Sequence, residues 1–191
     1  MLVNRRSPAC AGRALLAAFF VAEGRLRQGQ AARSFSAGDA DRGTTKSIGM
    51  AFAVAGLAGP SLASVSRGRL PSPVGWVGVA VMGAGLSLRV WSARTLGACY
   101  TRTLRVEADQ PVVEAGPYAY VRHPGYAGVT AMWVGYGLAL TSLPAVAATT
   151  VPMLVAYHRR IAAEETMLTN SLGDPYRAYQ QRTARLIPRI Y

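Results

Sequence analysis

The chain has 191 residues with a net charge of +12, and 51% of its residues are hydrophobic while only 16% are charged. Together with 20 glycines, this composition fits a small membrane protein with several spans better than a soluble domain. The basic residues are scattered and no nucleic-acid motif accompanies them, which argues against nucleic-acid binding. Cys10 and Cys99 form no CxxC pair and no ligand set with the two histidines, so we expect no metal site.

Residues 1–46 differ in composition from the rest of the chain. Up to residue 36 they hold six arginines and a single acid, Glu23, around an apolar run at 14–22 that is too short to span a bilayer. An arginine-rich, acid-poor helical segment is typical of a transit peptide, and RSFS at 33–36 resembles a mitochondrial processing site. A disordered basic tail or a wrongly assigned start codon would explain the same composition, whereas a secretory signal peptide fits worse. We predict a basic leader, poorly packed over its first 36 residues.

Two apolar segments follow the leader. Residues 48–65 carry no charge, and residues 74–88 form a glycine-rich run that extends to Trp91 if Arg89 snorkels. Both segments are candidates for transmembrane helices. The glycines of the second run (Gly75, Gly78, Gly83 and Gly85) would allow a neighbouring helix backbone to approach closely. They do not form a dinucleotide-binding fingerprint, because no strand precedes them.

Residues 126–157 carry no charge over thirty-two positions. A single helix of that length would be about 48 Å long, whereas the hydrocarbon core of a bilayer is about 30 Å thick. The sequence therefore predicts a helical hairpin that is broken near residues 141–144. We expect the second arm to leave the membrane at His158 and to continue as a helix to about Leu172, with a short helix after Gly173.

These segments predict an all-α integral membrane protein with about four transmembrane helices in a domain at 47–191. With four crossings, the N-terminus, residues 94–125 and residues 158–191 lie on one side with nearly all the basic residues. The positive-inside rule places that side in the cytosol or, after import, in the matrix or stroma. A transit peptide would imply a mitochondrial or plastid membrane, and otherwise we expect the endoplasmic reticulum or plasma membrane.

The polar residues next to the hairpin form two clusters. The stretch 116–128, GPYAYVRHPGYAG, crowds an arginine, a histidine and three tyrosines together, and Arg160, Glu164 and Glu165 follow the hairpin. Because a hairpin brings its open ends together, we expect both clusters on one membrane face, where ionisable groups usually serve function. Arg160 and Glu164 are four residues apart on one helix face, so a plain surface salt bridge is the alternative. His123 could likewise be an ordinary interfacial histidine.

The motifs GPYAYVRHPGYAG, RRIAAEE, LGDPYRAY and RLIP, spaced around an apolar hairpin, resemble the isoprenylcysteine carboxyl methyltransferase family. That family belongs to a membrane superfamily that includes phospholipid N-methyltransferases. The resemblance covers residues 110–188, and residues 1–46 match nothing in it. It implies methyl transfer from S-adenosyl-L-methionine, bound by short helices in a pocket without a Rossmann sheet, to a lipophilic acceptor in the bilayer. The acceptor it favours is the prenylcysteine carboxylate, with a phospholipid amine or a small apolar acid as the alternative. A non-catalytic scaffold or small transporter is a reading of another class.

The resemblance also implies roles for individual residues. Arg160 matches the arginine that binds the substrate carboxylate and is the expected catalytic residue, supported by Arg122 and Glu165. Glu164 would pair with the ammonium of the cofactor, the amides at the helix start of Pro124 would suit its carboxylate, and tyrosine faces would suit its positive charge. Gln110 stands where the family commonly has His, and Glu114 adds a charge where it commonly has Thr. The full set of expected cofactor-binding residues is Gln110, Pro111, Val112, Val113, Tyr118, His123, Pro124, Gly125, Tyr126 and Glu164.

Overall fold

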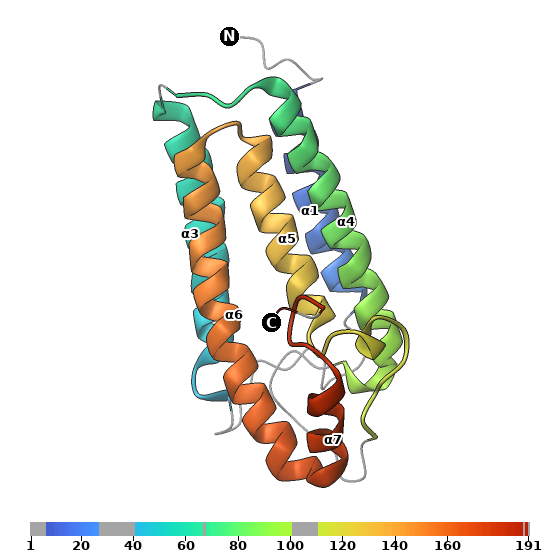
Figure 1. Ribbon diagram of the computed structural model, residues 1–191. Helices are drawn as coiled ribbons and strands as arrows, with labels where there is room; N and C mark the ends of the chain where they lie inside the picture. The colour runs from blue at the N-terminus through green and yellow to red at the C-terminus, as the bar shows by residue number, and fades with distance from the viewer. Residues whose placement is uncertain (1–6, 27–40, 67, 101–110, 189, 191) are drawn as a thin grey trace.

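The computed structural model describes residues 7–26, 41–66, 68–100, 111–188 and 190. Within these ranges extended pairing is limited to two isolated bridges, so the expected all-α fold is confirmed (Figure 1). The elements are α1 (Pro8–Leu26), α3 (Thr44–Val65), α4 (Ser72–Leu96), η2 (Gly97–Cys99), η3 (Gly116–Ala119), α5 (Pro124–Ala139), α6 (Leu143–Leu172) and α7 (Asp174–Arg182).

Five long helices, α1 and α3 to α6, lie side by side as a bundle, and α7 crosses one end of it (Figure 1). Helices α4 and α5 run antiparallel and pack closely at two pairs of glycines. A Cβ atom placed on Gly78 would lie 2.5 Å from the carbonyl oxygen of Gly135, and one placed on Gly85 would lie 2.5 Å from that of Gly128. The expected close approach of helix backbones is therefore confirmed at these positions.

Helix α1 is a full member of the bundle and runs parallel to α4. Its first residue, Pro8, lies against Gly75 near the start of α4, while Glu23 binds Arg89 near the end of α4. The side chain of Phe19 is only 1% exposed and belongs to the main hydrophobic core. The prediction of a poorly packed leader is therefore wrong for residues 8–26, because this helix has an apolar face that the other helices cover.

The direction of α1 also corrects the expected topology. Pro8 lies at the same end of the bundle as the loops at residues 68–71 and 140–142, which are joined by the bridge between Arg69 and Ser142. The prediction that the N-terminal segment starts on the side of residues 94–125 is therefore wrong for α1. Asp41, which comes just before α3, does lie at the expected end of the bundle, opposite Pro8 and beside Arg160 of α6.

The C-terminal hairpin matches the prediction. Helix α5 ends at Ala139, and α6 begins at Leu143, after Ser142, whose side chain accepts a hydrogen bond from the amide of Ala145 over 3.4 Å and so caps the helix. Helix α6 continues past His158 to Leu172, and Gly173, with a φ of 63°, then turns the chain into α7.

Two of the described helices, α3 and α4, are long and apolar enough to cross a membrane by length and composition. Their surfaces carry large apolar side chains that no other described element covers, such as Leu57 and Val65 on α3, which are 73% and 74% exposed.

Candidate functional site

A cavity of about 230 Å³ lies at the end of the bundle where α5 begins. Helices α1, α3, α4, α5, α6 and α7 all contribute to its wall, together with residues from 99–100 and 111–123. The structure places both predicted polar clusters there. The predicted site residues that line the cavity are Pro111, Val112, Val113, Tyr118, Arg122, His123, Gly125, Tyr126, Arg160 and Glu164.

Three predicted residues are not part of this wall as described. Pro124 begins α5, as expected, but does not line the cavity. The amides of Tyr126 and Ala127 each bond to the carbonyl of His123 over 3.1 Å, so the expectation that helix-start amides serve a ligand is wrong for these two. Glu165 does not line the cavity, and Gln110 lies outside the described residues.

Tyr126 connects the two clusters. Its hydroxyl donates a hydrogen bond to Oε2 of Glu164 over 2.6 Å and accepts one from Nε of Arg160 over 3.2 Å. Its ring stacks with the ring of His123, at 5.6 Å between centroids, and with the ring of Tyr157, at 4.8 Å. The direct distance from Nε of Arg160 to Glu164 is 3.9 Å, so the predicted pair meets mainly through the tyrosine.

The guanidinium of Arg160 binds the start of α3, a contact that the sequence does not reveal. Its Nη1 lies 2.5 Å from Oδ1 of Asp41, 3.0 Å from Oγ1 of Thr44 and 3.2 Å from Oγ1 of Thr45. Asp41 and Arg160 are only 1% and 3% exposed. An Asp at 41 and threonines at 44 and 45 suit the start of a helix, but nothing in this pattern points to an arginine 119 residues away.

Asp41 is held as a carboxylate by its surroundings. It accepts hydrogen bonds from the hydroxyl of Thr45 over 2.7 Å and from the amide of Thr45 over 3.1 Å. Burial by itself would raise the pKa of Asp41, but these hydrogen bonds and the charge of Arg160 outweigh it and lower the pKa below its ordinary value. Asp41 is therefore ionised at neutral pH.

A second buried ion pair joins α1 to α4 at the wall of the cavity. Nε and Nη2 of Arg89 donate to the two oxygens of Glu23 over 2.6 and 3.2 Å, and the hydroxyl of Tyr100 donates to Glu23 over 3.1 Å. Arg89 also donates to the hydroxyl of Tyr100 and lies over its ring. The sequence reasoning missed this cluster. The available signal was the charge of Arg89 within an apolar run, which requires a partner.

Behind the cavity, Glu165 gathers three basic side chains. Its Oε1 accepts from Nε of Arg122 over 2.8 Å and lies 3.3 Å from Nε2 of His123, while its Oε2 accepts from Nε of Arg185 over 3.0 Å. Burial would raise the pKa of Glu165, but the hydrogen bonds from His123 and Arg122 and their charges lower it to about 2.

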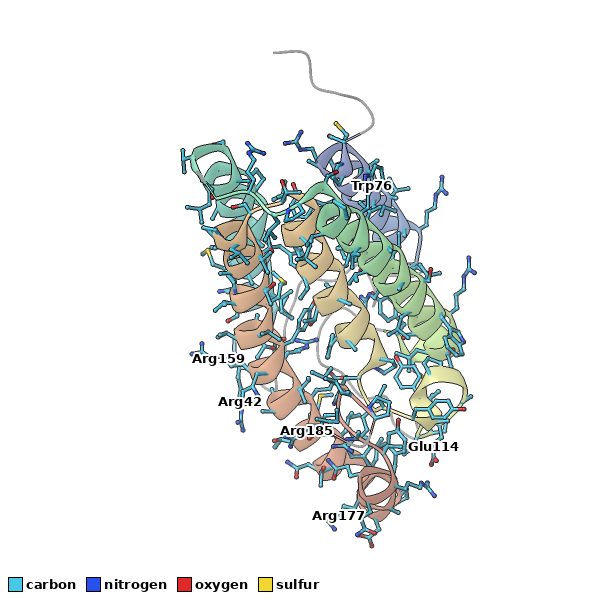
Figure 2. All side chains as sticks on the ribbon, turned by 45° about the horizontal axis from the view of Figure 1, so that its top comes forward. Arg42, Trp76, Glu114, Arg159, Arg177 and Arg185 are labelled. Carbon is cyan, nitrogen blue, oxygen red and sulfur yellow. The ribbon has the colours of Figure 1, made fainter. Side chains whose placement is uncertain are left out.

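This cluster also holds the C-terminal segment against the cavity. Arg122 donates to the carbonyls of Gln180, over 3.0 Å, and Thr183, and the hydroxyl of Tyr179 donates to the carbonyl of Tyr118 over 2.7 Å. Glu114 lies on the same end of the molecule (Figure 2) and forms an exposed ion pair with Arg182 over 2.6 Å. The carboxylate of Glu114, which the family pattern does not predict, therefore pairs with Arg182 and does not line the cavity.

The family model described as phospholipid methyltransferase matches residues 74–174. A protein-S-isoprenylcysteine O-methyltransferase from Tribolium castaneum is 31% identical over 116 residues, which cover 60% of this chain and 41% of the relative. Methanethiol S-methyltransferase 1 from Bradyrhizobium diazoefficiens is 40% identical over 72 residues, covering 37% of this chain and 24% of the relative. The aligned region thus spans less than two thirds of each of these relatives.

The fold is also similar to a solved structure. The eukaryotic intramembrane Ras methyltransferase, an isoprenylcysteine carboxyl methyltransferase solved without a monobody, superposes with a TM-score of 0.68 at 23% sequence identity. The match covers 97% of this chain and 69% of that chain. Since so little of the chain lies outside the match, most of α1 lies inside it, although the sequence of residues 1–46 shows no resemblance to the family.

Proposed function

This chain belongs to the phospholipid methyltransferase family, and from that premise we propose that it transfers a methyl group from S-adenosyl-L-methionine to a lipophilic acceptor at a membrane. The relatives and the solved fold confirm the resemblance to isoprenylcysteine carboxyl methyltransferases that the motifs indicate. The observation that carries the proposal is the cavity itself, because the motif residues from both arms of the hairpin converge on its wall.

The residues of the cavity fit the proposed cofactor. S-adenosyl-L-methionine would supply a methyl group on a positively charged sulfur, next to an ammonium and a carboxylate. Glu164 presents to the cavity a carboxylate whose side chain is 24% exposed, and we assign it to the ammonium. The rings of Tyr118 and Tyr126 line the same cavity and suit a cationic sulfur. The chain from Pro111 to Val113 lines the cavity too and is assigned to the cofactor from the resemblance.

The membrane arrangement is part of the proposal. Helices α3 to α6 would form four crossings, as the sequence predicts, with the cavity at the face where α6 leaves the bilayer. Helix α1 has nineteen residues and would be about 28 Å long, which nearly matches the hydrocarbon core, so we include it as a fifth embedded helix. Because α1 packs into the bundle, the transit-peptide hypothesis loses its main support, and the endoplasmic reticulum or plasma membrane is favoured.

Two acceptors have specific support. The names of the relatives favour the carboxylate of a prenylcysteine, and the family description favours a phospholipid amine. Methylation of a carboxylate requires no general base, whereas an amine must lose a proton during the reaction. We take the prenylcysteine carboxylate as the first acceptor to test because the names of the relatives favour it, and the contact of Arg160 with Asp41 is the observation that speaks against it.

The test is incubation of membranes that contain the full chain with a methyl-labelled donor. Label that is released by mild base indicates a methyl ester, and base-stable label in the lipid fraction indicates N-methylation. Purified protein that binds no S-adenosyl-L-methionine would instead support a non-catalytic scaffold. A variant with Asp174→Asn serves as the control, since the Asp174 side chain is 90% exposed and lies outside the cavity wall.

A further inference from the structure

Each arginine that lines the cavity has a carboxylate of this chain beside it. Arg89 pairs with Glu23 at 2.6 Å, and Arg160 pairs with Asp41 at 2.5 Å. Arg122, the third, pairs with Glu165 at 2.8 Å. The acids of the first two pairs come from the N-terminal 46 residues, which the sequence predicts to be a leader. No arginine described in the cavity wall therefore faces it without a carboxylate partner.

Resting on the proposed methyl transfer, we propose that Asp41 is a specificity-determining residue that occupies the carboxylate position on Arg160 and disfavours acceptors that carry a free carboxylate. An acceptor carboxylate would reach Nη1 of Arg160 only by displacing Asp41. An uncharged acceptor, such as a neutral amine, meets no such competition.

The geometry at Asp41 makes displacement difficult. Its Oδ1 accepts from Arg160, from the hydroxyl of Thr44 at 3.1 Å and from the hydroxyl of Thr45 at 2.7 Å, while its Oδ2 accepts from the amide of Thr45. Through the amide of Thr45, Asp41 also holds the first turn of α3, which begins at Thr44 after Gly43. Leaving this position would break a buried ion pair and leave that amide without its acceptor.

Glu164 differs from Asp41 in its pairing, and this difference favours cations over anions in the cavity. Its nearest arginine nitrogen is 3.9 Å away, and its side chain is much more exposed than that of Asp41. A cation entering the cavity therefore meets a carboxylate that is only loosely paired. An anion entering the cavity meets arginines that already have carboxylate partners.

The experiment measures binding of two matched probes, N-acetyl-S-farnesylcysteine and its methyl ester, to the purified full chain. The two probes differ only in the free carboxylate. We expect the wild-type protein to bind the acid no more tightly than the ester. We expect Asp41→Asn, which keeps a side-chain oxygen for the amide of Thr45, to raise the ratio of acid affinity to ester affinity at least tenfold.

Several outcomes would overturn the proposal. A tenfold preference of the wild-type protein for the acid would overturn it. This outcome requires no variant, so it remains decisive even if Asp41→Asn fails to fold. An unchanged ratio in a folded Asp41→Asn protein would show that Asp41 only supports the start of α3, because a structural role weakens both probes equally. Asp174→Asn should leave the ratio unchanged. Because probe binding requires no methyl donor, these results stand apart from the labelled-donor assay, whose failure would count against the proposed function alone.

Discussion

The hydroxyl of Tyr126 lies 2.6 Å from Oε2 of Glu164 and donates a hydrogen bond to it. This contact fixes one oxygen of the carboxylate without neutralising its charge, since a phenol is uncharged at neutral pH. The carboxylate therefore faces the cavity as a positioned anion.

Glu164→Gln should weaken binding of S-adenosyl-L-methionine, because the cofactor's ammonium would lose its charged partner. A hydrogen bond to a charged group contributes about 1.5–3 kcal/mol, which corresponds to roughly ten- to a hundred-fold in affinity. Calorimetric titration of the purified protein would measure the change. Cofactor affinity equal to wild type would remove Glu164 from the proposed site.

Arg160→Lys should spare cofactor binding and reduce methyl transfer. Lysine keeps the charge but lacks the planar fork with which Arg160 contacts Asp41 and Tyr126 at the same time. Cofactor affinity and the transfer rate should therefore separate between this variant and Glu164→Gln. Equal loss of cofactor affinity in both would mean that the two residues form only a structural pair.

Glu23→Gln should destabilise the protein, because Arg89 would keep its charge in a largely buried place without an acid beside it. Removing one partner of a buried ion pair costs about 3–5 kcal/mol. The double variant Glu23→Gln with Arg89→Met should recover much of that loss, and thermal unfolding in detergent measures both.

A chain that begins at Thr44 lacks Glu23 and Asp41 and should lose its fold or its activity. If it kept both, the leader hypothesis would stand after all.

Gly85→Ala should push α4 and α5 apart, since the new methyl group would lie 2.5 Å from the carbonyl oxygen of Gly128. Overpacking of this kind costs about 1–3 kcal/mol. Gly83→Ala is the matched control, because its methyl group would meet nothing within 4 Å. Replacing a helical glycine there should stabilise the protein by about 0.5–1 kcal/mol. Equal melting temperatures for the two variants would argue against the glycine contact.

Cysteine labelling in sealed vesicles should show the start of α1 on the side opposite the cavity. In a background without Cys10 and Cys99, we expect Ser7→Cys and Gly68→Cys to react with an impermeant reagent from one side. Gly43→Cys and Asp174→Cys should react from the other. Labelling of Ser7→Cys together with Asp174→Cys would restore the topology expected from the sequence.

Much of the C-terminal half was predictable because its signals are local. A charge-free run of thirty-two residues is too long for one crossing and too short for two full ones, so a hairpin near Ser142 follows from length alone. Gly173 ends α6 through its positive φ, as its position after an apolar helix suggests. The convergence of Tyr126 with Glu164 then follows from the hairpin.

The missed features depend on contacts between distant parts of the chain. The bond from Arg160 to Asp41 spans 119 residues, and that from Arg89 to Glu23 spans 66. The high arginine content of residues 1–46 favoured the prediction of a basic leader. The apolar face with Phe19 is visible only when a neighbouring helix covers it, and the role of Glu23 only when Arg89 is beside it.

The length of α6 bears on how an acceptor could reach the cavity. Its thirty residues form one helix of about 45 Å, and about 30 Å of that suffices to cross the hydrocarbon core. Counted from Leu143, Arg160 lies about 26 Å along the axis and Glu164 about 32 Å. In the proposed arrangement, with Leu143 at the opposite edge of the hydrocarbon core, both would lie near the depth of the lipid head groups. An acceptor whose reactive atom floats in the aqueous phase, or sinks among the acyl chains, would miss both residues. The protein would thus choose its substrates by depth, and a molecule with a polar tip on a long apolar tail is the kind that rests at that level.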